Sequence, residues 1–291
     1  MKQLRGKVAL VTGASKGLGV HIALALAKQG VHLVLAARTA NALLDTCRAA
    51  EAHGVRALAV PVDLSDRASL EALVTRAENT FGRVDILVNN AGVLFSEDYA
   101  TIAPDAIDQT IRVNLRAPML LTRRVLPGMI ARGEGHIVNV SSVGGLGGAA
   151  YHESYSATKH ALLGFTRSLR LTLRAERHPI GASAVCPGFV PDTGMFHQSM
   201  RETGAEMPAL FGTASTDSVA RAVIRAIQHN HAEVVVNSLP FRPIVILQTV
   251  FPSLAGPIAA LTGIRKTCHA MAHGRPVRWL PSDARTDAAA E

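Results

Sequence analysis

The 291-residue sequence is poor in cysteine, in aromatic residues and in clustered charge. Its three cysteines, Cys47, Cys186 and Cys268, are far apart and form no C-x-x-C pair, which excludes a disulfide framework and favours a reducing compartment. The histidines have no metal-ligand spacing, so no metal site is expected. The formal net charge is +8, but no lysine-rich run or basic-aromatic alternation predicts nucleic-acid binding. We interpret the charge as attraction for phosphate-bearing small ligands or anionic membrane surfaces.

We also expect no signal peptide. Residues 1–7 lead directly into the apolar run 8–12, without the apolar core and small-residue cleavage site of a secretory leader. We therefore expect a cytoplasmic protein, with membrane association left open by an apolar segment near the carboxyl end. Apolar residues make up 48% of the sequence and charged residues 18%, which is typical of a globular protein with a sizeable core.

Short apolar runs alternate with helical stretches over most of the chain. Strands are expected at 8–12, 31–36, 55–60, 84–88, 136–141, 181–186 and 233–236. A long helical stretch at 104–131 is expected to be interrupted near Pro118. This alternation predicts an α/β fold: a Rossmann-type doubly wound parallel sheet of about seven strands, with helices on both faces. Ligands of such sheets bind at the carboxyl ends of the strands.

The first strand ends in the turn G-A-S-K-G-L-G at residues 13–19. Glycines let the backbone approach a pyrophosphate at a helix N-terminus, so the turn predicts a dinucleotide site, with a purely structural turn as the alternative. No acidic residue follows the second strand to hold a ribose 2′-hydroxyl. Instead Ala37 leaves room, and Arg38 and Lys16 supply cations suited to a 2′-phosphate. We predict NADP(H) over NAD(H), with solvated surface cations as the alternative.

Tyr155 and Lys159 lie one helical turn apart, so their side chains are expected to meet, roughly 6 Å apart along the helix axis. Ser142 closes the preceding strand thirteen residues before Tyr155, across a glycine-rich loop. A phenol near an ammonium and a serine hydroxyl suits general acid/base chemistry on a carbonyl, although Y-x-x-x-K alone is equally an ordinary helix pair. Ser141 should face the other side of its strand, and Tyr151 has no lysine four residues later, so neither is expected to replace them.

Several separated motifs resemble the short-chain dehydrogenase/reductase family over residues 7 to about 237. They are T-G-A-S-K-G-L-G at 12–19, Asp63, N-N-A-G at 89–92, Asn114, Ser142, Y-S-A-T-K at 155–159 and Pro187-Gly188. The resemblance implies a nicotinamide cofactor, with Tyr155 as general acid/base and Ser142 positioning the carbonyl or carbinol. It also implies that Lys159 lowers the tyrosine pKa and binds the nicotinamide ribose, and that Asn114 anchors a water linking Lys159 to solvent.

The expected catalytic residues are therefore Asn114, Ser142, Tyr155 and Lys159. The expected cofactor-binding residues, from the motifs and the resemblance together, are Gly13, Ser15, Lys16, Gly17, Leu18, Gly19, Arg38, Asp63, Leu64, Asn90, Ala91, Gly92, Tyr155, Lys159, Pro187, Gly188, Val190 and Thr193. The segment 189–213 is expected to form a mobile flap over the substrate.

A segment without charged side chains, 243–264, follows the last strand, with Arg242, Arg265 and Lys266 at its ends. Its length permits a membrane span, but its prolines and glycines predict broken helices. Helices that cover the substrate entrance or a neighbouring subunit are favoured, and peripheral membrane contact through 238–266 is the alternative. Both interpretations point to an apolar substrate, and the resemblance extends to members with such extensions that act on steroids, retinoids or lipid-derived ketones.

These observations divide the chain into a catalytic domain at 1–237, a hydrophobic extension at 238–280 and a polar, disordered tail at 281–291. We expect an NADP(H)-dependent oxidoreductase that interconverts a secondary alcohol and a ketone on an apolar, steroid-, retinoid- or lipid-like substrate, as a homodimer or homotetramer. Two alternatives remain: a catalytically silent nucleotide-sensing scaffold and a membrane-surface binding module. The intact Ser142, Tyr155 and Lys159 favour the enzyme, because a sensor does not need them.

Overall fold

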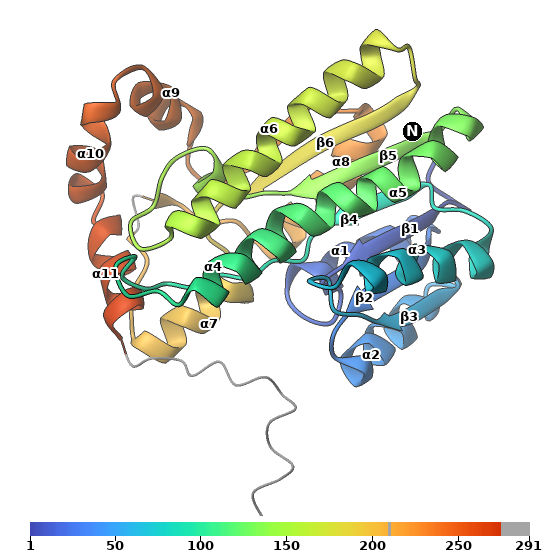
Figure 1. Cartoon of the computed structure of the whole chain (residues 1–291), viewed down its shortest axis with the longest axis horizontal. Helices are drawn as coiled ribbons and strands as arrows, with labels where there is room; N and C mark the ends of the chain where they lie inside the picture. Colours follow the sequence, from blue (N-terminus) through green and yellow to red (C-terminus); the bar gives the residue numbers. More distant parts are fainter. Residues whose placement is uncertain (209–210, 275–291) are drawn as a thin grey trace, which may run out of the picture.

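The computed structural model describes residues 1–208 and 211–274. They form an α/β structure of three layers, in which a parallel sheet lies between two layers of helices (Figure 1). The sheet has seven strands in the order β3-β2-β1-β4-β5-β6-β7. The strands are β1 (Val8–Thr12), β2 (His32–Ala37), β3 (Ala57–Pro61), β4 (Ile86–Asn89), β5 (Gly135–Val140), β6 (Ile180–Pro187) and β7 (Glu233–Val236). The predicted fold class and number of strands are confirmed, and each strand begins within two residues of its predicted position.

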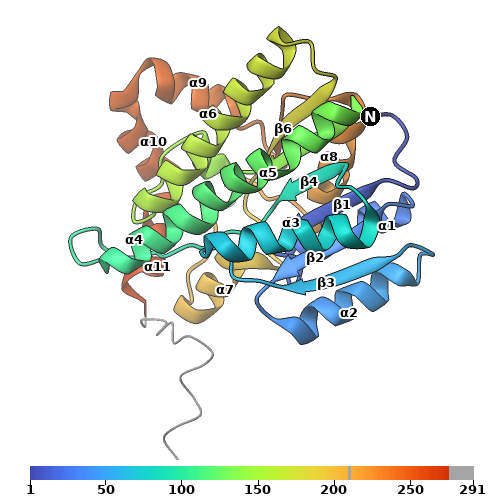
Figure 2. The ribbon, with the colours of Figure 1, turned by 45° about the vertical axis from the view of Figure 1, so that its right-hand side comes forward.

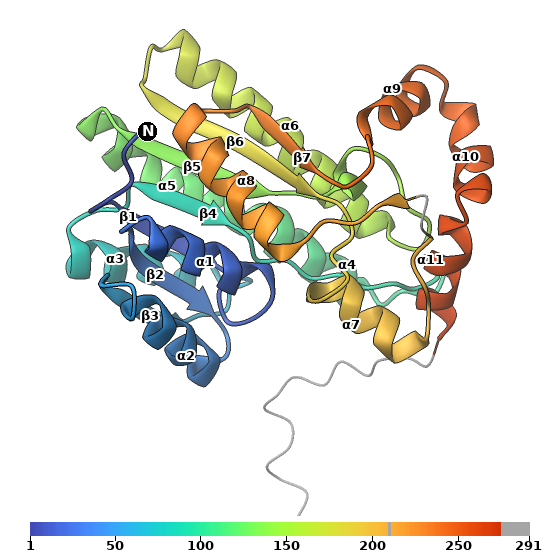
Figure 3. The same ribbon diagram turned by 180° about the vertical axis from the view of Figure 1, so that it is seen from behind.

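Helices cover both faces of the sheet. One face carries α1 (Leu18–Lys28), α2 (Ala40–Glu51) and α8 (Thr216–His229), as Figure 3 shows, and the other carries α3 (Arg67–Phe81), α5 (Ala117–Arg132) and α6 (Glu153–Ala175), as Figure 2 shows. Alternate residues of β1 enter opposite cores: Ala9 and Val11 pack toward α1, and Val8 and Leu10 pack toward α3 and α5. Burial on both faces explains why these strands are continuous apolar runs.

The long helix predicted at 104–131 is irregular at Asn114 rather than at Pro118. Helix α4 (Pro104–Ile111) continues through one wide π-helical turn, η1 (Arg112–Arg116), into α5. Pro118 has no N–H to donate to the carbonyl four residues earlier, which belongs to Asn114. The helical hydrogen bonding is therefore interrupted just before the proline, where the π-turn lies. The prediction of a break near Pro118 is corrected by one turn, and the widened turn places a buried Asn114 beside the sheet.

After β7 the chain leaves the sheet and forms three short helices at one end of the molecule (Figure 1). They are α9 (Arg242–Val250), α10 (Ala255–Leu261) and α11 (Ile264–His273), with the short turn η4 (Pro252–Leu254) before α10. Buried Cys268 and Met271 fix α11 to the body, and the Thr267 hydroxyl donates to the carbonyl of Glu206 at 2.6 Å. None of the helices in the described ranges is long and apolar enough to cross a bilayer. The predicted tail 281–291 and residues 275–280 of the predicted extension lie outside the described residues.

A buried histidine lies inside the sheet. His136 on β5 is 1% exposed, and its Nε2 lies 2.8 Å from the hydroxyl of Ser183 on β6. That hydroxyl donates to the carbonyl of His231, so Nε2 carries the proton and the imidazole is neutral. Burial lowers the pKa of His136 to about 3, with further lowering from the N-terminus and Arg170. Gly181 leaves room for the ring, because a Cβ there would lie 2.1 Å from Nδ1 of His136.

We predict that acid destabilises the fold through His136. In the unfolded chain a histidine gains a proton below pH 6.5, whereas folded His136 does so only near pH 3, so stability is lost as the pH falls below 6.5. At pH 5 this single residue should lower the free energy of unfolding by about 2 kcal/mol. Urea unfolding at pH 7.5 and pH 5 should show a smaller drop for His136→Gln than for the wild type, whatever its stability at pH 7.5. The exposed control His53→Gln should keep the wild-type drop, and equal drops in all three proteins would contradict the prediction.

Candidate active site

The turn after β1 is built for close backbone approach. Gly13 and Gly17 have φ angles of +68° and +62°, which glycine adopts without strain. Gly19 lies beneath the turn, where a Cβ would be 2.0 Å from the carbonyl oxygen of Gly13. Helix α1 begins after Gly17 with no side-chain cap, so its first N–H groups and the positive end of its dipole are available to an anion.

The end of β4 is tied to the end of β1 by hydrogen bonds. The Thr12 hydroxyl accepts from the backbone N–H groups of Asn90 and Ala91, both at 3.1 Å, and the Asn90 amide donates to the Thr12 carbonyl at 3.0 Å. These bonds hold Asn90 beside the glycine turn, where a Cβ on Gly13 would lie 3.0 Å from its Nδ2. The Asn90 amide is therefore held in close packing between the two strand ends.

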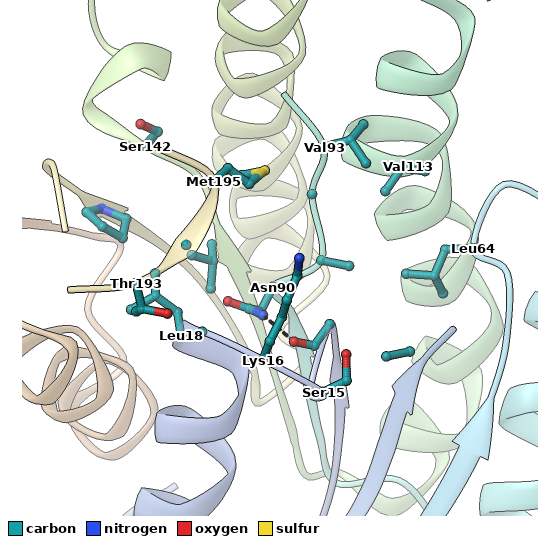
Figure 4. Close-up of a pocket in the computed structure, with 18 of the residues that line it drawn as sticks. Ser15, Lys16, Leu18, Leu64, Asn90, Val93, Val113, Ser142, Thr193 and Met195 are labelled. Carbon is teal, nitrogen blue, oxygen red and sulfur yellow. Dashed lines mark hydrogen bonds between the residues drawn. The ribbon is translucent and has the colours of Figure 1, made fainter. Parts of the chain in front are cut away.

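A cavity of about 330 Å³ lies above these strand ends. Figure 4 shows it with Thr193 on one side and Leu64 on the other. The predicted site residues that line it are Gly13, Ser15, Lys16, Gly17, Leu18, Arg38, Asp63, Leu64, Asn90, Ala91, Gly92, Ser142, Tyr155, Lys159, Pro187, Gly188, Val190 and Thr193. Two predicted residues do not line it: Gly19 packs beneath the turn, and Asn114 lies behind Val93.

Some lining residues were missed by the sequence analysis. Met195 and Phe196 belong to α7 (Gly194–Thr203), a helix inside the predicted flap 189–213, so only the segment and not the side chains was foreseen. Val93 directly follows the N-N-A-G motif and could have been inferred from it. Gln109 lies on α4 and Val113 in the π-turn η1, and no local pattern marks them.

The charges around this cavity fit a phosphate-bearing dinucleotide. Lys16 and Arg38 are exposed, and neither forms an ion pair with an acidic side chain within residues 1–208 and 211–274. The Asp63 carboxylate accepts from the backbone N–H of Ser65 at 2.8 Å, which fixes its position at the end of β3. Two free cations, an uncapped helix start and a glycine turn are the donor set that a pyrophosphate and a further phosphate require.

Ser142, Tyr155 and Lys159 meet where β5 ends and α6 begins. Ser142 and Tyr155 are neighbours, because a Cβ on Gly144 would lie 3.5 Å from the Ser142 oxygen and 3.5 Å from Cε1 of the Tyr155 ring. The Ser142 oxygen accepts from the backbone N–H of Gly144 at 3.1 Å. The Lys159 ammonium lies 5.6 Å from the centre of the Tyr155 ring and donates to the carbonyl of Val140 at 2.9 Å. The spacing of thirteen residues therefore does bring the two hydroxyls together, across the short turn η2 (Val143–Gly145).

Burial is the largest cause of the pKa shifts of Tyr155 and Lys159. It raises the pKa of Tyr155 to about 12, with the bond from Ser142 offsetting part of the rise and the Cys186 thiol adding to it. Burial also lowers the pKa of Lys159 to about 8. Desolvation of the phenolate is thus the largest influence on the pKa of Tyr155 in the protein alone. The phenol thus keeps its proton at neutral pH.

The side chains of Ser141 and Tyr151 make contacts outside the trio of Ser142, Tyr155 and Lys159. The Ser141 hydroxyl donates to the backbone carbonyl of Lys159 at 3.0 Å, although Ser141 also lines the first cavity. The ring of Tyr151 packs edge-on against His269 and His273 of α11, at centroid distances of 5.6 and 5.3 Å. Neither hydroxyl is part of the trio.

Asn114 is engaged with the backbone of the loop after β4. Its carboxamide oxygen accepts from the N–H of Val93 at 2.8 Å, and its nitrogen donates to the Val93 carbonyl at 2.9 Å and to the Thr158 hydroxyl at 3.3 Å. These bonds link the loop after β4 to α6, one residue from Lys159. The amide in the π-turn therefore positions the loop that borders the trio.

A second cavity, of about 360 Å³, begins at Ser142 and Tyr155 and extends beneath α9–α11. Its apolar lining includes Val143, Phe189, Phe196, Met207, Phe211, Phe241, Ile244 and Ile258. Ser142 and Tyr155 line both cavities, so the two hydroxyls stand where the two spaces meet.

Comparisons with known proteins agree with this geometry. The family described as short chain dehydrogenase matches residues 7–204. "Ketoacyl reductase HetN" of Nostoc sp. is 41% identical over 240 residues, which cover 82% of each chain. A solved metagenomic short-chain oxidoreductase in complex with NADP is 36% identical and superposes with a TM-score of 0.69, covering 81% of this chain and 100% of that one. A short chain dehydrogenase/reductase from Burkholderia phymatum in complex with NAD is 29% identical, with a TM-score of 0.78, covering 87% of this chain and 96% of that one.

Proposed function

Because the chain belongs to the short-chain dehydrogenase family, and is therefore an NAD(P)-dependent oxidoreductase acting on CH–OH groups, we propose that it reduces a ketone on an apolar, lipid-like substrate with NADPH. One observation carries the proposal: Ser142 and Tyr155 stand between a cavity suited to a dinucleotide and a cavity with mostly apolar walls. Catalysis is assigned to Ser142, Tyr155 and Lys159, with Asn114 as a positioning residue.

Bound NADPH would supply the hydride that reaches the carbonyl carbon. The Ser142 hydroxyl, which lines both cavities together with Tyr155, holds the substrate oxygen next to the phenol. Tyr155 gives that oxygen a proton as negative charge develops on it, and its raised pKa keeps the proton in place until then. Lys159, fixed by the carbonyl of Val140, stabilises the phenolate that is left behind. This division of roles favours the direction of reduction.

Tyr155→Phe tests this assignment. The variant should bind NADPH with an affinity within about twofold of the wild type and lose roughly 10³-fold in kcat, because only the proton donor is removed. NADPH absorbance followed against a series of ketones gives kcat, and quenching of NADPH fluorescence gives the affinity. The matched control Tyr151→Phe, which removes a hydroxyl four residues away, should keep wild-type kcat.

If the chain were a catalytically silent nucleotide-sensing scaffold, the wild type itself would show no ketone-dependent turnover. A wild-type chain that binds NADPH and oxidises it with no ketone of any chain length would support a nucleotide sensor. A Tyr155→Phe variant as active as the wild type would contradict the catalytic assignment even if the enzyme is active.

The choice of NADP(H) over NAD(H) rests on three residues. Ala37 is buried and small, and Lys16 and Arg38 line the cavity with no acidic partner in the described ranges. A 2′-phosphate is a dianion that a guanidinium binds through two parallel hydrogen bonds. The metagenomic relative was solved with NADP and the Burkholderia relative with NAD, so the residues of this chain carry the assignment.

Arg38→Asp should reverse the cofactor preference. The change replaces a phosphate donor with a carboxylate that repels the 2′-phosphate and accepts from a 2′-hydroxyl, so the ratio of kcat/KM for NADPH to that for NADH should fall at least about tenfold. Arg76→Asp, an exposed charge reversal on α3, should leave the ratio unchanged. An Arg38→Asp variant with the wild-type ratio would exclude a role for this guanidinium.

The extension gives the proposal its substrate class. The inner sides of α9 and α10 line the apolar cavity through Ile244, Gln248, Ala255 and Ala259. Helix α9 approaches the loop after β5 so closely that a Cβ on Gly147 would lie 3.0 Å from Oε1 of Gln248. We therefore assign residues 1–237 to catalysis and the described part of the predicted extension 238–280, residues 238–274, to a lid over the substrate. Nostoc HetN is named a ketoacyl reductase, which favours an acyl-type ketone over a steroid or retinoid.

A homodimer or homotetramer in the cytoplasm remains the proposed assembly. The oligomer is proposed because parallel sheets flanked by long exposed helices often associate. Size-exclusion chromatography with light scattering of the full chain would measure it.

Ala259→Phe should shorten the substrates that the enzyme accepts. Its side chain would fill part of the apolar cavity, so kcat/KM for long-chain ketones should fall about 10- to 100-fold while that for short ketones stays near the wild-type value. The neighbouring Ala260 is exposed and does not line the cavity, so Ala260→Phe is the matched control. Equal losses for short and long ketones would contradict a role of α10 in holding the substrate.

A further inference from the structure

The outer side of the extension carries a set of exposed apolar side chains. On α9, Ile246 and Val250 are 63% and 61% exposed, and on α10 Leu261 is 82% exposed. The whole set, called here the outer apolar surface, is Leu239, Ile246, Leu247, Val250, Phe251, Leu254 and Leu261. None of these except Leu239 lines the substrate cavity. Single exposed apolar residues are common, but seven within one short segment indicate an interaction surface.

Helical periodicity separates this surface from the cavity lining. On α9 the cavity is lined by Ile244 and Gln248, four residues apart, and the exposed pair Ile246 and Val250 is offset from them by two positions. An offset of two residues in a helix is about 200°, so the two pairs face opposite directions. The exposed side chains are therefore not required to close the lid.

The charge of the same segment has one sign. No aspartate or glutamate occurs from 234 to 274, whereas Arg242, Arg265 and Lys266 are exposed at the ends of the apolar segment. Arg242 is 3.8 Å from Glu233 on β7, and neither Arg265 nor Lys266 has an acidic partner in the ranges that the structure describes. Apolar side chains bordered only by cations match the interface of an anionic bilayer, where acyl chains lie beneath negative headgroups.

We propose that the outer apolar surface docks on bilayers containing anionic lipids, with α9 and α10 lying in the headgroup region. At 1.5 Å per residue, the nine residues of α9 and the seven of α10 span about 14 Å and about 11 Å, too short to cross the hydrocarbon core but suited to lying along the interface. The inference goes beyond the proposed reaction, and it rests on that reaction only for its consequence that apolar substrate reaches the enzyme from the bilayer.

The position of the substrate cavity supports this consequence. Arg265 is exposed and also lines the cavity. The cavity therefore reaches the protein surface next to one of the cations at the ends of the apolar segment. Docking would place this opening at the headgroup level. An apolar ketone would then move between lipid and cavity without crossing water, which its hydrophobic transfer free energy opposes.

A second copy of the chain fits the outer apolar surface less well than an anionic bilayer does. A symmetric contact would place Arg242, Arg265 and Lys266 of one copy near the same cations of the other, and 234–274 offers no acidic side chain to neutralise them. An apolar contact between copies remains a defined outcome of the test below.

Vesicle flotation of the full chain without substrate tests the proposal. The protein should float with vesicles of phosphatidylcholine and phosphatidylserine, float less with phosphatidylcholine alone, and lose binding as salt is raised. The double variant Ile246→Glu/Leu261→Glu should reduce the bound fraction at least about tenfold. Arg242→Glu/Lys266→Glu should abolish the preference for phosphatidylserine. Leu171→Glu is the matched control, because Leu171 is 67% exposed but lies on α6, and it should float like the wild type.

Thermal unfolding checks that each variant is folded. Flotation measures binding directly, so this readout does not depend on enzymatic activity. A folded wild type that floats with neither vesicle overturns the proposal, as does flotation that the Ile246→Glu/Leu261→Glu variant leaves unchanged. Light scattering without lipid gives the third outcome: an oligomer that only this variant dissociates would assign the surface to a second copy and overturn membrane docking. A failure of ketone reduction would leave all these results intact, so the two proposals fail separately.

Discussion

The close approach of the turn after β5 to helix α6 is the constraint on which the site depends. A Cβ on Gly145 would lie 2.7 Å from the Ser141 hydroxyl and 2.8 Å from the backbone carbonyl of Lys159, so only glycine permits this contact. The Ser141 hydroxyl secures it by donating to that same carbonyl. With the turn held against α6, Ser142 reaches the phenol of Tyr155. Two side chains thirteen residues apart thus become neighbours in one site because the backbone of the turn packs against the backbone of α6.

The same close packing sets the protonation of the unit. Excluding water disfavours both charged forms, and so the pKa of Tyr155 rises to about 12 while that of Lys159 falls to about 8. A phenol that keeps its proton is prepared to donate it, which suits reduction of a carbonyl. For the reverse reaction the phenol must lose its proton, and the buried site makes that step unfavourable unless further positive charge enters it.

The sequence analysis predicted the sheet and most of the cavity lining because both follow from short-range patterns and one topological rule. Strands buried on both faces are continuous apolar runs, and parallel strands bring Asp63, Asn90 and Ser142 to the same edge. The helix irregularity lies just before Pro118 because the proline affects the carbonyl four residues before it. The rise in the pKa of Tyr155 was not predicted because its main cause, burial, is a tertiary property. Gln109 was missed because helix orientation decides which side chains reach the cavity.

The extension shows how one sequence feature can contain two surfaces. Read as a run without charge, 243–264 is uniformly apolar, and the sequence offers a lid and a membrane contact as competing alternatives. In the structure, prolines and glycines divide the run into helices too short to span a bilayer, and each helix has an inner and an outer side. Ala255 and Ala259 are small where the cavity needs space, whereas Leu261 extends outward. The two roles use different sides of the same helices, so a lid over the substrate and contact with a membrane are compatible in one chain.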